Sequence, residues 1–214
     1  MATKQAEQTR PQASLPRVIG LTGGVGMGKT TVSDYLHRQY HLPILDADLY
    51  ARQAVAPNSV LLGQIVERYG RQILKPDGSL DRARLGNLVF NNSAERQWLE
   101  QQIHPFVRQQ IEQDLKQLSQ QGQEIAVLVV PLLFEARMTD LVTEIWVVYT
   151  ADQQQVERLQ QRDQLQLDQV HARINSQMPI QKKLAQADVV LENTSSPEFL
   201  FAQVDRALAR QSGS

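Results

Sequence analysis

Two hydrophobic patterns alternate along the chain and indicate which segments form strands and which form helices. Short apolar runs typical of strands occupy residues 17–21, 42–48, 125–130, 144–149 and 188–191. Residues 125–130 are apolar on both faces, as in a central strand of a parallel sheet. Between these runs, apolar residues recur at the three- or four-residue spacing of a helix face. Strands that alternate with helices predict a parallel, three-layer α/β core.

Helices are predicted at residues 31–40, 60–69, 81–90, 92–119, 152–162, 168–175, 179–186 and 199–209. Three of them carry start signals: the capping-box pairs Asn92–Glu95 and Thr150–Gln153, and the dipeptide Ser196-Pro197. Residues 57–122 contain no run that resembles a buried parallel strand. We therefore expect this stretch to be a mostly helical insertion that holds a second substrate.

Composition narrows the classes of protein that fit this pattern. With 214 residues, the chain is long enough for one sizeable core and a small inserted subdomain. The net charge of −1 gives no overall attraction to nucleic acid or to an anionic membrane. The absence of cysteine suits a reducing cytosol, and no apolar run reaches the ~20 residues of a membrane-spanning helix. We expect a cytoplasmic monomer, with a small homo-oligomer as the alternative, that binds neither nucleic acid nor membrane.

A glycine-rich segment follows the first predicted strand. Residues 20–31 contain the pattern G-x-x-x-x-G-K-T, in which Gly23 is followed by Gly28, Lys29 and Thr30. Glycines let backbone N–H groups curl around an anion, and the start of the next helix adds partial positive charge. In such a P-loop the lysine reaches the β- and γ-phosphates and the threonine hydroxyl binds Mg²⁺. The segment predicts a site for a nucleoside triphosphate with Mg²⁺.

The other strand ends select among the classes of P-loop protein. No Asn-Lys-x-Asp motif is present to read a guanine base, and residues 127–130 do not end in the Asp-Glu pair of a mechanical ATPase. Two acids, Asp46 and Asp48, instead follow the second strand. On a continuing strand they would share one side. Such a carboxylate suits a kinase that transfers phosphate to a hydroxyl group. The alternative is that these acids, Asp46 in particular, only cap the next helix.

Basic residues after the fourth strand indicate a second part of the site. Arg158 and Arg162 lie four residues apart, on one face of a predicted helix, and Arg173, Lys182 and Lys183 follow. Beside a P-loop, these cations are typical of a mobile lid that closes on the phosphates during transfer. A solvated surface is the alternative for each of them taken singly.

The order of several motifs resembles the dephospho-CoA kinase family. These motifs are Leu-Asp-Ala-Asp at 45–48, Ile-His-Pro at 103–105, Val-Pro-Leu-Leu-Phe-Glu at 130–135, the arginine pair at 158 and 162, and Gln-Met-Pro at 177–179. The resemblance covers about residues 17–210. It implies an α/β fold in which a three-layer P-loop core with a parallel sheet carries a helical acceptor-binding insertion and a helical lid. It also implies transfer of the ATP γ-phosphate to the ribose 3′-hydroxyl of dephospho-CoA, the last step of coenzyme A synthesis.

The resemblance assigns roles residue by residue. The ATP phosphate loop matches Gly26, Met27, Gly28, Lys29, Thr30 and Thr31. Asp48 matches a proposed general base, Arg158 and Arg162 match the lid, and Asn193 lies in the stretch expected near adenine. Arg52, His104 and Arg108 fall where the acceptor is expected. Plainer alternatives are a helix kink at His104, a surface position for Arg52 and a turn at Asn193.

Three parts and one reaction are therefore expected. Residues 1–16, polar and rich in glutamine, would form a disordered tail. Residues 17–56 and 123–210 would form the kinase core, with the lid at about 158–182, and residues 57–122 the subdomain that binds dephospho-CoA. The alternatives for function are a kinase for another small acceptor, such as a nucleoside monophosphate, and a non-enzymatic, nucleotide-dependent regulatory module. An acceptor base and clustered arginines argue against the module, since a switch needs neither.

Overall fold

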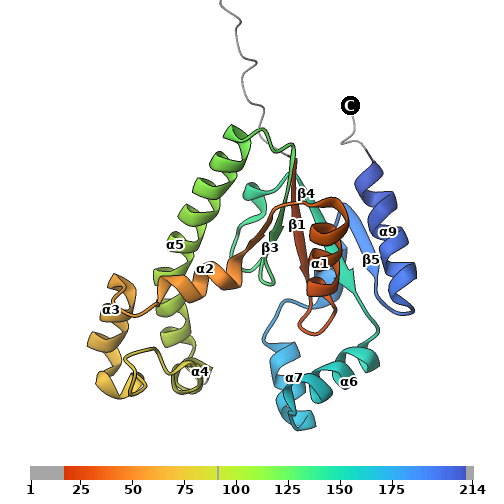
Figure 1. The fold of residues 1–214 in the computed structure, drawn as a ribbon. Helices are drawn as coiled ribbons and strands as arrows, with labels where there is room; N and C mark the ends of the chain where they lie inside the picture. The colour runs from red at the N-terminus through yellow and green to blue at the C-terminus, as the bar shows by residue number, and fades with distance from the viewer. Residues whose placement is uncertain (1–16, 91, 211–214) are drawn as a thin grey trace, which may run out of the picture.

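The computed structural model describes residues 17–90 and 92–210, so the tail expected at residues 1–16 lies outside the described residues. One sheet of five parallel strands, in the order β2-β3-β1-β4-β5, forms the centre of the molecule (Figure 1). The strands are β1 (Arg17–Gly23), β2 (Ile44–Asp46), β3 (Ile125–Val129), β4 (Glu144–Tyr149) and β5 (Val189–Glu192). All five overlap runs that the hydrophobic pattern predicts, although β1 and β5 extend one or two residues further.

Helices cover both faces of this sheet. They are α1 (Lys29–Tyr40), α2 (Ala47–Ala54), α3 (Val60–Tyr69), α4 (Arg82–Phe90), α5 (Ser93–Gln120), α6 (Asp152–Asp163), α7 (Leu167–Asn175), α8 (Ile180–Leu184) and α9 (Pro197–Ala209). Short 3₁₀ turns stand at Arg71–Ile73 and Thr139–Leu141. All the predicted helices are present, and α2 is an additional one.

Alternation along the strands divides the core into two layers. Successive side chains of a strand point to opposite faces. Val18 of β1 accordingly packs in a cluster with Val107 of α5, whereas Ile19 packs in another with Leu36 of α1 and Leu200 of α9. Figure 1 shows α5 beside one face and α1 with α9 beside the other. The three-layer α/β arrangement is as predicted.

The second strand is shorter than expected, and this moves the two acids. β2 ends at Asp46, whose carboxylate accepts a hydrogen bond of 2.8 Å from the Asp48 N–H and so begins α2. The expectation that Asp46 and Asp48 alternate along one strand is therefore wrong, and the alternative that Asp46 caps a helix is correct. A cap that binds the N–H two residues later competes locally with strand extension.

The capping pairs also differ in part from expectation. Asn92 accepts hydrogen bonds from the N–H groups of Ala94 and Glu95, but the Glu95 carboxylate binds Arg68 and Tyr69 instead of closing the box. At the other predicted pair, α6 begins after Ala151 with no side-chain cap. Ser196 does cap α9, by accepting the N–H of Phe199.

Residues 57–122 contain helices and a single isolated bridge, between Leu74 and Leu80, in their described part. A separate hydrophobic cluster joins α3, α4 and the first part of α5 around Ile65 and Ile73, both fully buried. The second half of α5 instead packs on the sheet through Ile111. The long helix therefore links this cluster to the core, while the division into domains stays a prediction. Among the described residues, none of the helices is long and apolar enough to cross a bilayer.

Candidate active site

The P-loop connects β1 to α1 through backbone conformations that only glycine adopts readily. Gly26 and Gly28 have φ angles of 75° and 99°. A Cβ on Gly28 would lie 2.2 Å from Nδ2 of Asn193, and one on Gly26 would lie 2.9 Å from Cγ of Leu159. Both positions therefore require glycine for conformation and for space. The first helical residue is Lys29, so the free N–H groups at the start of α1 face the loop.

Lys29 folds back along this loop. Its Nζ donates hydrogen bonds to the carbonyl oxygens of Gly23, at 3.1 Å, and Gly24, at 2.9 Å. Desolvation, followed by the positive charge of Lys183, lowers the pKa of Lys29 to about 8. The ammonium group therefore stays protonated at neutral pH but with a small margin. It can exchange two carbonyl partners for phosphate oxygens without leaving the loop.

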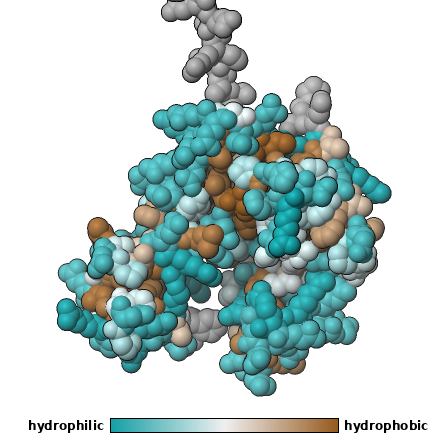
Figure 2. All heavy atoms as spheres, in the orientation of Figure 1, coloured by the Kyte–Doolittle hydropathy of each residue, from teal (hydrophilic) through white to brown (hydrophobic). Residues whose placement is uncertain are grey.

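A cleft of about 910 Å³ opens in front of the P-loop and collects most of the predicted site residues. Those that line it are Gly26, Gly28, Lys29, Thr30, Thr31, Asp48, Arg158 and Arg162. Figure 2 shows a hollow between the α3–α4 lobe and the α6–α7 lobe, with hydrophilic side chains along its walls, whereas the lining of the cleft itself comes from the P-loop, α2, α6 and the segments after β2 and β3. The structure thus brings donor-loop, acid and arginine residues to one place.

Two acids face this cleft from the end of β2 and the start of α2. Both Asp46 and Asp48 line it, although Asp46 also caps the helix. The walls remove part of the water around Asp48, and this desolvation, with the neighbouring Asp46 carboxylate, raises the pKa of Asp48 even though the residue is exposed overall. Mg²⁺ usually takes one or two protein oxygens together with water and substrate phosphates. The hydroxyl of Thr30 and these carboxylates fit that donor set.

The two arginines of α6 enter the cleft with different partners. Arg158 Nη2 donates to the carbonyl oxygen of Asn193 at 3.1 Å, which holds it near the P-loop. Arg162 is more exposed and pairs with Asp163 at 2.8 Å, and the same carboxylate also binds Arg173. Exposed pairs of this kind are weak, about 0–1 kcal/mol. Arg162 can therefore leave Asp163 and bind a substrate phosphate at little cost in free energy.

Several predicted residues lie elsewhere. Arg108 pairs with Asp140 at 2.8 Å and is not in the lining of the cleft. His104 lies half-buried on α5 and is also outside the lining. Arg52 lines a neighbouring pocket. Asn193 donates its side-chain amide to the carbonyl oxygen of Met27 at 3.0 Å, so it holds the loop in place.

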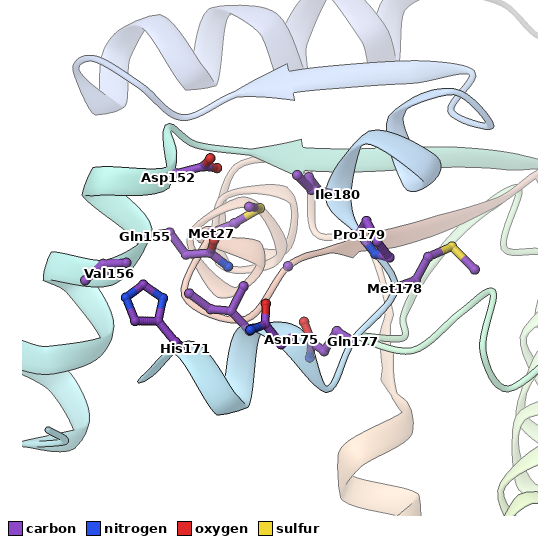
Figure 3. A pocket seen from close by; sticks show the side chains of 12 residues that line it. Met27, Asp152, Gln155, Val156, His171, Asn175, Gln177, Met178, Pro179 and Ile180 are labelled. Atoms are coloured by element: carbon purple, nitrogen blue, oxygen red, sulfur yellow. The ribbon is translucent and has the colours of Figure 1, made fainter. Parts of the chain in front are cut away.

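A second cavity of about 420 Å³ lies behind the loop, and buried Met27 faces it (Figure 3). It is bounded by α6, α7 and the segment 177–180. With a cavity at its back, the loop depends on hydrogen bonds for its position. Gln155 donates to the carbonyl oxygen of Val25 at 2.8 Å, and the Val25 N–H donates to Gln177 at 2.9 Å. Both polar backbone groups of Val25 are therefore held by glutamines: Gln177, which the Gln-Met-Pro motif contains, and Gln155, which sequence reasoning did not single out.

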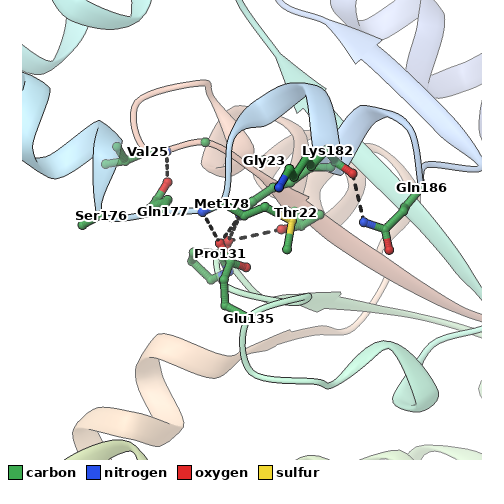
Figure 4. A network of polar contacts seen from close by, with 12 residues as sticks. Thr22, Gly23, Val25, Pro131, Glu135, Ser176, Gln177, Met178, Lys182 and Gln186 are labelled. Carbon is green, nitrogen blue, oxygen red and sulfur yellow. Dashed lines mark hydrogen bonds and ion pairs between the residues drawn. The ribbon is translucent and has the colours of Figure 1, made fainter. Parts of the chain in front are cut away.

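A buried lysine fastens the same region to the sheet. Lys183 has no exposed surface, and its Nζ binds the Glu135 carboxylate at 2.9 Å and the Pro131 carbonyl oxygen at 3.0 Å. Figure 4 shows these two partners, Glu135 and Pro131, beside the segment that contains Met178. The Glu135 carboxylate also accepts the Met178 N–H at 2.9 Å. The interpretation of Lys183 as a lid cation is therefore wrong. In a sequence, two adjacent lysines usually indicate an exposed surface. Only the motif ending in Glu135 could have indicated the partner of Lys183.

Comparison with known proteins gives the family. The dephospho-CoA kinase family model matches residues 17–198. The chain belongs to the dephospho-CoA kinase family. A dephospho-CoA kinase of Trichormus variabilis is 55% identical over 90% of this chain and 96% of its own. The activity of the present chain is thus ATP-dependent phosphorylation of dephospho-CoA, a step of coenzyme A biosynthesis.

Solved structures agree with the fold. A crystal structure from Thermus thermophilus has a TM-score of 0.79 at 32% identity and covers 94% of this chain and 100% of its own. A dephospho-CoA kinase from Campylobacter jejuni has a TM-score of 0.68 at 27% identity, over 90% of this chain and 96% of its own. The predicted P-loop kinase fold of this dephospho-CoA kinase family member is confirmed.

Proposed function

We propose that this kinase transfers the γ-phosphate of ATP to the ribose 3′-hydroxyl of dephospho-CoA, with Asp48 as general base. The observation that carries the proposal is the cleft in which Asp48 faces Lys29, Arg158 and Arg162. A base must lie beside the phosphate donor to meet both substrates. Asp48 does so from the first turn of α2, a rigid element that also leads toward the helical insertion.

The P-loop binds the donor. Lys29 and the backbone N–H groups of residues 26–30 hold the β- and γ-phosphates, and Asn193, which touches the loop, contributes on the adenine side. Mg²⁺ would be held by the Thr30 hydroxyl, and when bound it supplies charge neutralisation between the two phosphates. The positive charges of Arg158 and Arg162 stabilise the transferring group as its bonds loosen.

Asp48 orients the acceptor hydroxyl and takes its proton as the new bond forms. The loose transition state of phosphoryl transfer requires little deprotonation early on, so a carboxylate is a sufficient base. Desolvation raises the pKa of Asp48, which makes its carboxylate a better proton acceptor. Arg52, His104 and Arg108 stay candidate acceptor contacts. Arg52 is favoured because it lies one turn after Asp48, whereas Arg108 is already paired.

The first test replaces the base. Asp48→Asn keeps the size of the side chain but removes its basicity, so kcat should fall at least 10²-fold, within the range of general-base catalysis. Steady-state assays of ADP release at saturating substrates measure it. Asp34→Asn, an exposed acid on α1, is the control and should retain kcat. A near-normal kcat for Asp48→Asn would refute the assignment.

The phosphorylated position is tested on the product. Phosphate on the 3′-oxygen gives coenzyme A with a new phosphomonoester, which ³¹P NMR distinguishes from other isomers. In the same assay AMP, CMP and dTMP should be poor acceptors. Faster turnover of a nucleoside monophosphate would point to the rival acceptor class.

The binding partners, the oligomeric state and the cellular location are part of the same proposal. ATP and dephospho-CoA are the substrates, and we propose a cytoplasmic monomer that needs neither nucleic acid nor membrane. The cysteine-free composition supports a reducing compartment. Light scattering after size-exclusion chromatography, with and without substrates, tests the monomer against a small homo-oligomer.

A further inference from the structure

A pocket of about 350 Å³ lies where the end of α2 meets the start of α4, next to the main cleft. Three cationic side chains line it: Arg52 of α2, Lys75 of the turn before α4, and Arg82 of α4. Arg82 Nη2 donates to the Arg52 carbonyl oxygen at 3.3 Å, so α4 is fastened to α2 at this point. The cations come from three separate segments and meet only in the fold.

These cations differ from the five described arginines that form ion pairs. Arg17, Arg68, Arg108, Arg162 and Arg173 each form an ion pair, whereas Arg52, Lys75 and Arg82 form none within the described part of the chain. Asp81 is the one acid among the lining residues, and its carboxylate accepts the Arg84 N–H at the start of α4.

The pocket lining therefore carries three cations and one acid, and the carboxylates of Asp48 and Asp77, outside the lining, also act on Arg52 and Lys75. Desolvation, followed by the charge of Arg52, lowers the pKa of Arg82, which is the effect of gathering like charges. Cations held together against their mutual repulsion favour an anion that accepts hydrogen bonds from several of them. The pocket has the chemistry of a phosphate or diphosphate site.

Its position relates it to the acceptor rather than to ATP. Arg52 lies four residues after Asp48 on α2, about 6 Å along the helix axis. The net pKa of Asp48 is raised, mainly by desolvation, while the charge of Arg52 acts in the opposite sense. The ATP phosphates belong to the P-loop, on the other side of Asp48. An anion in this pocket would belong to the molecule whose hydroxyl meets Asp48.

We propose that Arg52, Lys75 and Arg82 form the subsite that binds the 5′-diphosphate of dephospho-CoA. This assignment rests on the proposed function, because it requires the acceptor ribose to lie at Asp48. In dephospho-CoA the diphosphate is attached through C5′ to C4′, the ring carbon next to C3′, so it lies only a few bonds from the 3′-hydroxyl. A spacing of one helical turn between base and cation matches that geometry. The subsite selects acceptors with a diphosphate over bare nucleosides.

The test compares two charge-removing substitutions on the same helix. Arg82→Gln removes a pocket cation, whereas Arg84→Gln removes a cation of α4 outside the pocket, bound to the Gln72 carbonyl oxygen. KM for dephospho-CoA should rise at least tenfold in Arg82→Gln, as expected from losing a charge-assisted bond to phosphate. KM for ATP and kcat at saturation should stay within twofold. Arg84→Gln should leave all three constants within twofold.

Adenosine, which lacks the diphosphate, separates binding from a structural effect. With adenosine as acceptor, the difference between Arg82→Gln and wild type should shrink to within twofold in kcat/KM. An equal loss with both acceptors, or an unchanged KM for dephospho-CoA, would overturn the proposal. Thermal unfolding of both variants checks that they are folded.

Failure of the base assignment would look different. If Asp48 is not the base, Asp48→Asn keeps its kcat with both acceptors, while the tenfold KM effect of Arg82→Gln remains. If the diphosphate binds elsewhere, Asp48→Asn still loses kcat, and Arg82→Gln and Arg84→Gln behave alike.

Discussion

At the scale of single residues, the chemistry of Lys29 is set by what surrounds it. Its ammonium group is partly removed from water and lies near the cation Lys183, while the acid Asp48 acts in the opposite sense. Arg162 and Glu135 contribute smaller effects of opposite sign. The net result is a P-loop lysine whose pKa is lowered to about 8, close to physiological pH.

We therefore expect ATP binding to weaken above about pH 8. The protonated ammonium binds phosphate, so as pH rises through the pKa of Lys29 the free protein loses that proton, and the Kd for ATP should rise about tenfold per pH unit. Fluorescence titration between pH 6.5 and 9.5 measures it. Lys29→Arg, which does not titrate there, should remove the dependence. A flat Kd in the wild-type protein would contradict the assignment.

At the scale of elements, one short segment ties the lid side to the core. Gln177 binds the P-loop at Val25, and Lys183 of α8 binds Glu135 after β3. α8 is therefore anchored to the end of a central strand. A moving lid would therefore consist of α6 and α7, which precede α8 in the chain. The predicted end of the lid, near residue 182, lies inside the anchored helix α8.

The ion pair predicts an order of stability among variants. Glu135→Gln leaves the fully buried ammonium of Lys183 without a counter-charge and should cost about 3 kcal/mol. Lys183→Met should cost less, because the partly exposed Glu135 can be rehydrated and keeps the Met178 N–H. Urea unfolding measures both. Lys182→Met, at the exposed neighbouring position, is the matched control and should stay within about 0.5 kcal/mol. Equal losses at 182 and 183 would show that the pair does not matter.

At the scale of the whole molecule, two helical lobes face each other across an open cleft. On one side Arg82 of α4 lines the small cationic pocket together with Arg52 of α2 and Lys75, and on the other side α6 carries Arg158 and Arg162. Transfer to a hydroxyl rather than to water requires that water be excluded when both substrates are bound. The weak surface pair of Arg162 with Asp163 is suited to opening as the lobes approach.

Closure can be measured directly because the chain has no cysteine. Dyes attached at Glu67→Cys on α3 and Asp168→Cys on α7, both exposed positions, report the distance between the lobes. We expect energy transfer to increase when a non-hydrolysable ATP analogue and dephospho-CoA are both present, and less with either alone. Adding Arg162→Gln should reduce the change. Equal transfer in all states would mean that the cleft is rigid.

Much of the fold follows from local sequence. Strand and helix periodicity is a property of neighbouring residues, so all five strands and most helices could be predicted. The exception is α2. Its N-cap, Asp46, is also the last residue of β2, so no turn residues separate the strand from the helix in the sequence. The P-loop was also predictable, because the positive φ angles of Gly26 and Gly28 require glycine and so leave a recognisable local motif.

Sequence alone therefore determined the P-loop, the α/β alternation and, through ordered motifs, the kinase family. Only the tertiary structure decided which side chains share a site. Gln177 reaches Val25 from 152 residues away, Lys183 is buried against Glu135, and Arg52 meets Arg82 across two helices. The physical reason is that local conformation depends on adjacent residues, whereas burial and charge pairing depend on which distant segments the packed core brings together.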